Sequence, residues 1–241
     1  MCGRYVLHSP LDELGDIFEA MPSPSNVAGG FASGDGWGPD YNITPTQTVP
    51  VVALNGQGER TLVPMRWGLV PGWSKDGPGS RPLFNARSET VASKPSFRAA
   101  YRRRRALVPC NGFYEWVKAE DDTGDEVRLP YYIVDTERPV FAIAAIWDQW
   151  TPKDDEEARP LLSCSMLTME ADGAMAELHH RQPVRLPEDQ WSEWLAPRGE
   201  KDAVLERYLP SDTLAYHRVD TEVNSGRAGG EHLIEPLEAA Q

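Results

Sequence analysis

The sequence predicts an α+β fold built mainly from antiparallel β-sheet with short helices around it. Short apolar segments separated by turn residues fill the middle of the chain, which is typical of strands. Helical patterns interrupt these segments without the regular strand–helix alternation of a parallel sheet. A hydrophobic content of 40% with eight Trp in 241 residues is enough for a substantial core. No internal repeat or linker is visible, so one domain over residues 1–241 is expected.

The N-terminal third of the chain is expected to form a helix, a loop and a hairpin. Ser9 and Pro10 precede apolar residues that recur at helical spacing as far as Met21, and Pro is favoured at the first position of a helix. Residues 22–40 are rich in Gly, Pro and Ser, which predicts a flexible surface loop. Strands are expected at 49–54 and 61–67, joined by a turn at Asn55-Gly56.

The rest of the chain continues this mixture. Residues 119–126 are strongly acidic and are expected to form the tip of a hairpin, because such runs usually lie in solvent. Strands are predicted at 107–109, 113–118, 131–135, 140–146 and 161–168, and helices at 95–104, 171–178, 187–195 and 201–208.

The net charge of −13 argues against nucleic-acid binding through overall charge, but the charge is unevenly distributed. The first 118 residues hold 13 basic and 10 acidic side chains, whereas the remainder hold 11 and 27. Arg98 and residues 102–105 form a dense basic cluster. Because the local potential governs docking, an acidic protein with such a cluster can still bind DNA on one face.

The composition also bears on location and cofactors. No segment approaches the ~20 apolar residues of a membrane span, and no secretory signal is visible. Three scattered cysteines do not make a disulfide framework or a zinc site, so a reducing, cytoplasmic setting is expected. No cofactor or metal is indicated, and a monomer is expected.

Cys2 is the residue with the most distinctive chemistry. Methionine aminopeptidases remove Met1 before a small residue, so Cys2 is expected to become the N-terminus. Its amine and thiol, with reference pKa values of about 7.7–8.0 and 8.5, are both partly deprotonated near neutral pH. This pair can condense with an aldehyde to an imine and then a thiazolidine, or the thiol can act as a nucleophile with the amine as its base. An ordinary second residue without chemistry is an equally open interpretation.

Glu115 is a candidate for proton transfer. On a strand it shares one face with Phe113 and Val117, which are both apolar. Such surroundings disfavour the carboxylate and raise the pKa, so the group could donate and accept protons near neutral pH. For an isolated Glu, a solvated position or an ion pair with an Arg is the more common alternative.

His179 follows a predicted helix and could move a proton near pH 7, or could be a structural histidine. His180 is expected to be exposed, and Arg181 is suited to hold a phosphate. The His pair lacks partners at ligand spacing, so a metal site is not favoured.

Two other segments carry candidate binding residues. Asn85 offers a donor and an acceptor and Arg87 a phosphate-binding fork, although both could simply belong to a polar loop. Trp67 and Trp73 flank a turn rich in Gly and Pro beside Arg66, and aromatic faces near cations can stack unpaired bases. Because Trp is more often found in the core, one of the two is expected to be buried and the other partly exposed.

The motifs around these candidate residues, taken in their order along the chain, resemble those of the SRAP family (SOS-response-associated peptidase proteins), the abasic-site processing proteins. The resemblance covers nearly the whole chain, and its long central motif is highly specific. The matching stretches are MCGRY at 1–5, YNITPTQ at 41–47, MRWGLVPGWSKD at 65–76, NARSETVASKPSFRAAYRRRRALVPCNGFYEW at 85–116, AAIWDQW at 144–150, LHHRQP at 178–183 and VNSGRAGGEHLIEPL at 223–237.

The resemblance implies a single barrel-like SRAP domain that binds single-stranded DNA with an abasic site. It also implies a thiazolidine crosslink between Cys2 and the ring-opened sugar, which shields the lesion. Asn85 matches the residue that orients sugar and amine, Glu115 the carboxylate that assists proton transfer, and His179 the residue that aids ring opening. The DNA contacts that the resemblance implies are Arg4, Asn42, Trp67, Trp73, Arg87 and Arg181.

The chain departs from the family pattern at His180 and Gln182, which stand where the family usually has Asp and Met. Two other functions remain open for Cys2. It could serve as the nucleophile of an N-terminal-nucleophile amidohydrolase, or of a cysteine peptidase acting with His179 and Glu115 whose activity is limited to removal of Met1. A DNA-binding module in which Cys2 is incidental is a third alternative.

Overall fold

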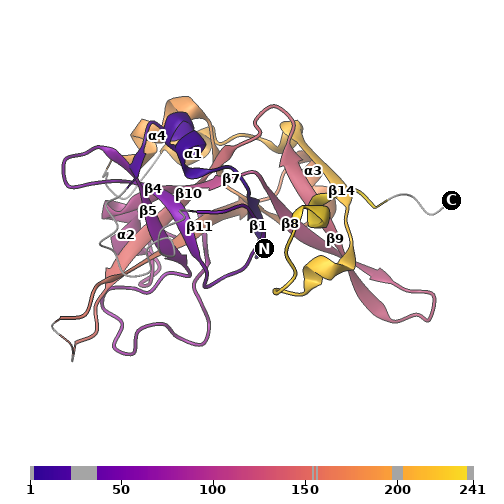
Figure 1. Cartoon of the computed structure of the whole chain (residues 1–241), viewed down its shortest axis with the longest axis horizontal. Helices are drawn as coiled ribbons and strands as arrows, with labels where there is room; N and C mark the ends of the chain where they lie inside the picture. The colour runs from indigo at the N-terminus through magenta and orange to yellow at the C-terminus, as the bar shows by residue number, and fades with distance from the viewer. Residues whose placement is uncertain (1–2, 23–36, 154, 156, 197–202, 238–241) are drawn as a thin grey trace.

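In the computed structural model, described for residues 3–22, 37–153, 155, 157–196 and 203–237, the chain forms two β-sheets that lie side by side along the longest axis of the molecule (Figure 1). The larger sheet occupies the left half of that view and the smaller sheet the right half. The predicted α+β class with mainly antiparallel sheet is confirmed.

The larger sheet closes into a barrel. Its strands follow the order β11, β10, β7, β4, β5, and neighbours in this order are antiparallel. The first and last of these strands, β11 and β5, also pair with each other in parallel, which closes the sheet. The five strands are β4 (Thr48–Leu54), β5 (Arg60–Trp67), β7 (Arg105–Cys110), β10 (Phe141–Trp150) and β11 (Leu161–Glu170). Shorter strands extend it: β2 (Met21–Pro22) on β5, β6 (Asn85–Arg87) and β12 (Arg181–Pro183) on β11, and β13 (Arg185–Leu186) on β10.

The smaller sheet has the order β14, β9, β8, β1, β3. Its strands are β1 (Tyr5–Leu7), β3 (Asp40–Ile43), β8 (Gly112–Glu120), β9 (Glu126–Asp135) and β14 (Leu214–Arg218). Only Asn111 separates β7 from β8, so the chain passes directly from the barrel into this sheet. The Asn111 side chain supports the passage by accepting the backbone N–H groups of His8 and Ser9 and donating to the carbonyl of Pro139.

In the described part of the chain, four α-helices cover the barrel edges and the junction. They are α1 (Leu11–Phe18), α2 (Arg98–Arg103), α3 (Gly173–Leu178) and α4 (Glu188–Leu195). Helices α1 and α4 lie together above the barrel (Figure 1), where Phe18 stacks on Trp191 with ring centroids 4.5 Å apart. The α4 residue Trp194 is fully buried and donates its indole N–H to the carbonyl of Ala106 on β7. Helix α3 lies beside β14 and ends at Leu178, directly before His179.

The C-terminal strap (residues 219–237) packs against the outer face of the smaller sheet. Its apolar residues Val219, Val223 and Leu233 join a small buried cluster with Tyr114 and Tyr132 from β8 and β9. Short 3-10 turns at Thr221–Asn224 and Glu231–Ile234 shape the strap. The strap thereby closes one side of the sheet that carries Glu115.

Several predicted boundaries are corrected. The helix expected at 201–208 is a 3-10 turn over Ala203–Arg207 with Val204 in the core, and residues 201–202 lie outside the described residues. The helix expected at 95–104 is limited to α2, and the loop expected at 22–40 gives way to β3 at Asp40, while residues 23–36 lie outside the described residues. Strand β10 extends beyond Ile146 to Trp150. No described helix has the length and apolar character needed to cross a membrane.

Candidate functional site

Glu115 lines a hollow between β8 and the end of α3. The hollow encloses about 610 Å³, and side chains from β8, β9 and α3 form its wall. Glu115 is 3% exposed, and burial raises the pKa of its carboxyl, as the apolar face of the strand predicted. The protonated form of Glu115 is therefore favoured at a higher pH than for a solvated glutamate.

His179 stands opposite Glu115 at the end of α3. Its Nδ1 lies 4.0 Å from Oε1 of Glu115. The same Nδ1 lies 2.9 Å from the backbone nitrogen of Arg181 and 3.1 Å from its carbonyl oxygen, and these contacts fix the ring. Burial lowers the pKa of His179, so the neutral ring is favoured. A carboxylic acid and a neutral imidazole thus meet at one hollow, and such a pair can both donate and accept protons near neutral pH.

The turn that carries His179 is anchored through Arg181. The Arg181 guanidinium makes a bidentate pair with Glu89, at 2.6 and 2.9 Å, and also donates to the carbonyl of Thr168. This hydrogen bonding holds the pKa of the Glu89 carboxyl below its usual range. Gln182, where the family usually has Met, accepts the backbone N–H of Asp172 at the start of α3. Both contacts position the helix and the turn around His179.

His180, where the family usually has Asp, is exposed and packs against His179 with ring centroids 4.2 Å apart. The proximity of the two rings lowers the pKa of His180, because a charge on His179 would repel a second proton. His180 lines both the Glu115 hollow and a neighbouring hollow of about 370 Å³, which also contains Arg87 and Arg181. The two hollows therefore meet at His180.

The N-terminal strand leads towards Glu115. In the antiparallel register of β1 and β8, Tyr5 faces Phe113, and the carbonyl of Arg4 accepts the N–H of Tyr114. Moving two residues back along one strand and two forward along the other brings Gly3 towards Glu115. Gly3 lines a hollow of about 380 Å³ that shares Trp116 with the Glu115 hollow. Cys2 itself lies outside the described residues.

Asn85 and Arg87 lie on β6, which pairs in parallel with β11. Since they are two residues apart on a strand, their side chains leave the sheet on the same side. Arg87 is exposed and lines the hollow that holds His180 and Arg181. The structure thus brings β6 and the His179 turn together at β11, although 92 residues separate Glu89 from Arg181.

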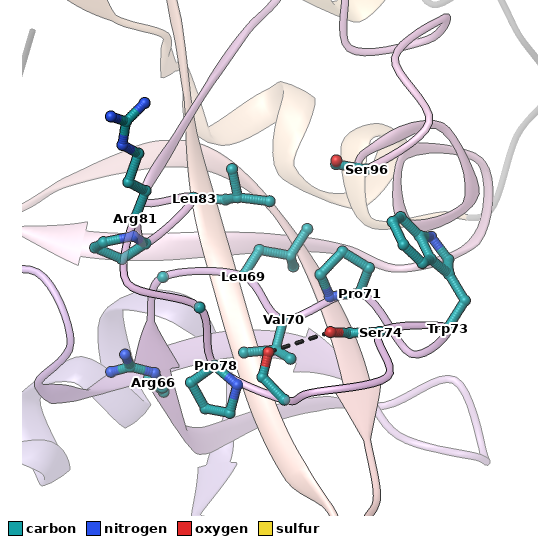
Figure 2. A pocket seen from close by; sticks show the side chains of 14 residues that line it. Arg66, Leu69, Val70, Pro71, Trp73, Ser74, Pro78, Arg81, Leu83 and Ser96 are labelled. Carbon is teal, nitrogen blue, oxygen red and sulfur yellow. Dashed lines mark hydrogen bonds between the residues drawn. The ribbon is translucent and has the colours of Figure 1, made fainter.

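As expected, one Trp of the pair is buried, Trp67, and the other, Trp73, is exposed. The burial of Trp67 corrects the base-stacking role that the resemblance implies for it. Trp67 has no exposed surface and donates its indole N–H to the carbonyl of Phe84, so it supports the segment leading into Asn85 and has no face for a base. Trp73 is 62% exposed. It stands at the rim of a hollow of about 200 Å³, with Pro71 and Leu69 between it and Arg81 (Figure 2).

Three of the residues that the resemblance implies as DNA contacts already form hydrogen bonds within the protein. They are Arg4, Asn42 and Arg181. Arg4 donates to Oδ1 of Asn42 and to the carbonyl of Val223, and lies 5.6 Å from the ring centroid of Trp116. Asn42 is 3% exposed and donates to two further carbonyls of the strap. Direct DNA contacts from Asn42 or Arg181 would require these bonds to break, whereas half-buried Arg4 still borders a hollow.

Three residues that line the site were missed by the sequence interpretation. Trp116, Lys118 and Arg128 border the Glu115 hollow from the β8–β9 hairpin. The alternation of β8 was a usable signal for Trp116 and Lys118, since they share a face. Arg128 gave no comparable signal, because its position opposite Lys118 depends on the register of the hairpin.

The lowered pKa of His179 has a consequence for stability. A group whose pKa is lower in the folded state contributes stability above its unfolded pKa, near 6.5, and this contribution is lost as pH falls through the folded value. We expect His179→Gln to lose less stability than the wild type when pH is lowered from about 7 to 5. Urea unfolding at both pH values measures this difference, and equal pH dependence in the two proteins would contradict a buried, neutral His179.

Several proteins can be aligned with this chain over nearly all of its length. The abasic site processing protein YoqW of Bacillus subtilis (strain 168) is 33% identical over 239 residues, which cover 98% of this chain and 99% of that protein. Its counterpart YoaM from the same organism is 31% identical over 238 residues, with 98% of both chains covered. The abasic site processing protein HMCES of Pongo abelii is 27% identical over 277 residues, with 99% of this chain and 77% of that protein covered.

The fold has a close counterpart among solved structures. An X-ray crystal structure of a protein from Bacteroides thetaiotaomicron superposes with a TM-score of 0.77 at 20% identity, covering 98% of this chain and all of the other. A family model described as SOS response associated peptidase (SRAP) matches residues 1–226. This chain therefore belongs to the SRAP family.

Proposed function

We propose that this protein processes abasic sites in single-stranded DNA by forming a covalent crosslink through Cys2. The observation that carries the proposal is the pairing of Glu115 and His179 across one hollow, beside the strand that leads to the N-terminus. The names of the relatives, all abasic site processing proteins, agree with this assignment. Membrane contact plays no part in it.

The chemistry uses both groups of an N-terminal cysteine. Once Met1 is removed, the α-amine adds to the C1′ aldehyde of the ring-opened abasic sugar, and loss of water gives an imine. The thiol then adds to the imine carbon and its proton moves to the nitrogen, which closes a five-membered thiazolidine. The net change is the loss of one water, with no oxidation or reduction, so these two groups and a proton carrier suffice.

Glu115 and His179 supply that proton carrier. A protonated Glu115 can give a proton to the departing hydroxyl of the carbinolamine and take one back when the ring closes or reopens. Neutral His179 can accept or return the proton at the sugar oxygen during ring opening. Asn85 is assigned to orient the sugar and the amine through its amide.

The DNA strand is held, in this proposal, by exposed groups near the two hollows. Arg87 is the exposed guanidinium beside His180, and Trp73 offers an exposed ring on which an unpaired base can stack. Arg4 has an additional role in fixing the C-terminal strap to β1. Trp67 and Arg181 act as positioning residues, supporting β6 and the His179 turn.

A denaturing gel tests the proposal. The purified protein is mixed with single-stranded oligonucleotides that carry an abasic site, a tetrahydrofuran analogue without an aldehyde, or an intact base. A heat-stable shifted band is expected with the abasic oligonucleotide alone. Absence of that band, together with release of ammonia from glutamine, would replace the proposal with an N-terminal-nucleophile amidohydrolase. Release of Met1 only, without a DNA product, would favour a peptidase limited to its own terminus.

A further inference from the structure

A cationic ridge on the β8–β9 hairpin borders the site without a role in the reaction described above. It consists of Trp116 and Lys118 on β8 and Arg128 on β9. Trp116 and Arg128 line both the Glu115 hollow and the Gly3 hollow, and therefore separate the two. Whatever occupies either hollow meets these side chains.

The ridge places two like charges face to face, and the neighbouring Glu126 carboxylate attracts both. Lys118 and Arg128 face each other directly in the antiparallel register, and like charges in that relation destabilise a hairpin. Lys118 is partly compensated by an ion pair with Glu126 at 2.9 Å. Arg128 is exposed and attracts the same Glu126 carboxylate from a greater distance, since among the described residues the ion pair of Glu126 is with Lys118. An anion beside Arg128 would relieve this repulsion.

The neighbourhood is suited to a phosphodiester next to an unpaired nucleotide. The half-buried Trp116 ring is held by its indole N–H, which donates to Asn224 of the strap over 2.6 Å, and the Arg4 guanidinium lies 5.6 Å from the ring centroid. Both contacts fix the ring at the boundary of the hollows. Arginine matches phosphate geometry through its planar fork and keeps its charge at any physiological pH.

We propose that this ridge holds the DNA strand beside the abasic nucleotide, with Arg128 bound to a backbone phosphate and Lys118 contributing a second, weaker attraction. The choice of DNA as the occupant rests on the proposed function. The ridge sets affinity and placement of the strand and takes no part in the covalent steps. It also places two cations, beside Glu126 and Glu177, on the acidic half of the chain, where the sequence holds 27 acidic and 11 basic residues.

Non-covalent binding separates the ridge from the crosslinking chemistry. The probe is a single-stranded oligonucleotide with a tetrahydrofuran analogue, whose Kd is measured by fluorescence anisotropy between about 50 and 200 mM salt. We expect Arg128→Gln to weaken binding several-fold and to reduce the slope of log K against log salt by about 0.7, the value for one phosphate contact on a single strand. Arg128→Lys should recover part of the affinity, and Glu126→Gln, which frees Lys118, should tighten binding.

Arg159 provides the matched control, since it is exposed and lies in the loop joining β10 and β11, which is at the opposite end of the molecule from the hairpin tip (Figure 1). Arg159→Gln should leave both Kd and salt slope unchanged. The proposal that the ridge binds DNA would be overturned if the wild type and Arg128→Gln had equal slopes of log K against log salt, or if the wild type did not bind the probe. If the wild type forms no crosslink but Arg128→Gln still weakens binding of the probe, the proposed covalent function is overturned and the role of the ridge in DNA binding is retained.

Discussion

Cys2→Ala should remove the heat-stable crosslink to abasic DNA while leaving an imine that borohydride can trap. Alanine keeps the α-amine, so the first addition to the aldehyde is still possible, but there is no sulfur to close the thiazolidine. The imine hydrolyses readily, and the band should disappear on heating unless it has been reduced. The expected loss of stable product is essentially complete, which is the largest effect in this protein.

The control for this change is Cys164→Ala. Cys164 is fully buried on β11, and burial raises the pKa of its thiol to about 12, so it supplies no thiolate near neutral pH. Its replacement should leave the crosslink intact. A stable crosslink from Cys2→Ala, or its loss on replacing Cys164 in a folded protein, would show that another nucleophile forms the product.

Glu115→Gln should slow crosslink formation by about 10²–10⁴-fold, the usual contribution of a positioned acid or base. Glutamine keeps the shape and hydrogen-bonding capacity of the protonated side chain but transfers no proton. DNA binding, measured with the tetrahydrofuran oligonucleotide, should be nearly unchanged. Equal loss of binding and rate would indicate that Glu115 acts on DNA affinity instead of proton transfer.

The same variant reports whether Glu115 is buried as the carboxylic acid. A group with a raised folded pKa contributes stability below its unfolded pKa, about 4.3 for Glu, and loses it as pH rises through the folded value. The wild type should therefore lose stability over that interval through Glu115, and the glutamine variant should not. Unfolding at pH values from about 5 to 8 measures this, and it separates a catalytic defect from misfolding.

Local patterns marked Glu115 and His179 as candidates, whereas the roles proposed for them come from the family resemblance and remain predictions. Glu115 faces an apolar environment through strand alternation, and His179 lies where the α3 helix ends. These features need no knowledge of distant partners. The chemistry of Cys2 likewise depends on its place next to Met1, although its surroundings lie outside the described residues.

Long-range pairing explains what the sequence could not reveal. The guanidinium of Arg181 is taken up by Glu89, and Asn42 is enclosed by the strap, so neither is available as its residue type alone suggests. Barrel closure depends on β11 pairing in parallel with β5, strands nearly a hundred residues apart with no local signal. Arg128 reaches the site only because the hairpin register places it opposite Lys118.

The central claim, that the amine and thiol of Cys2 act together, is tested most directly by comparing the mature protein with a form that retains Met1 behind an uncleaved tag. Intact mass spectrometry establishes the N-terminus of each, and both are incubated with the same abasic oligonucleotide. The mature protein should gain the mass of the oligonucleotide less one water, and the Met1-retaining form should gain nothing because its Cys2 nitrogen is an amide. Equal crosslinking by the two forms would contradict the thiazolidine and the role assigned to Cys2.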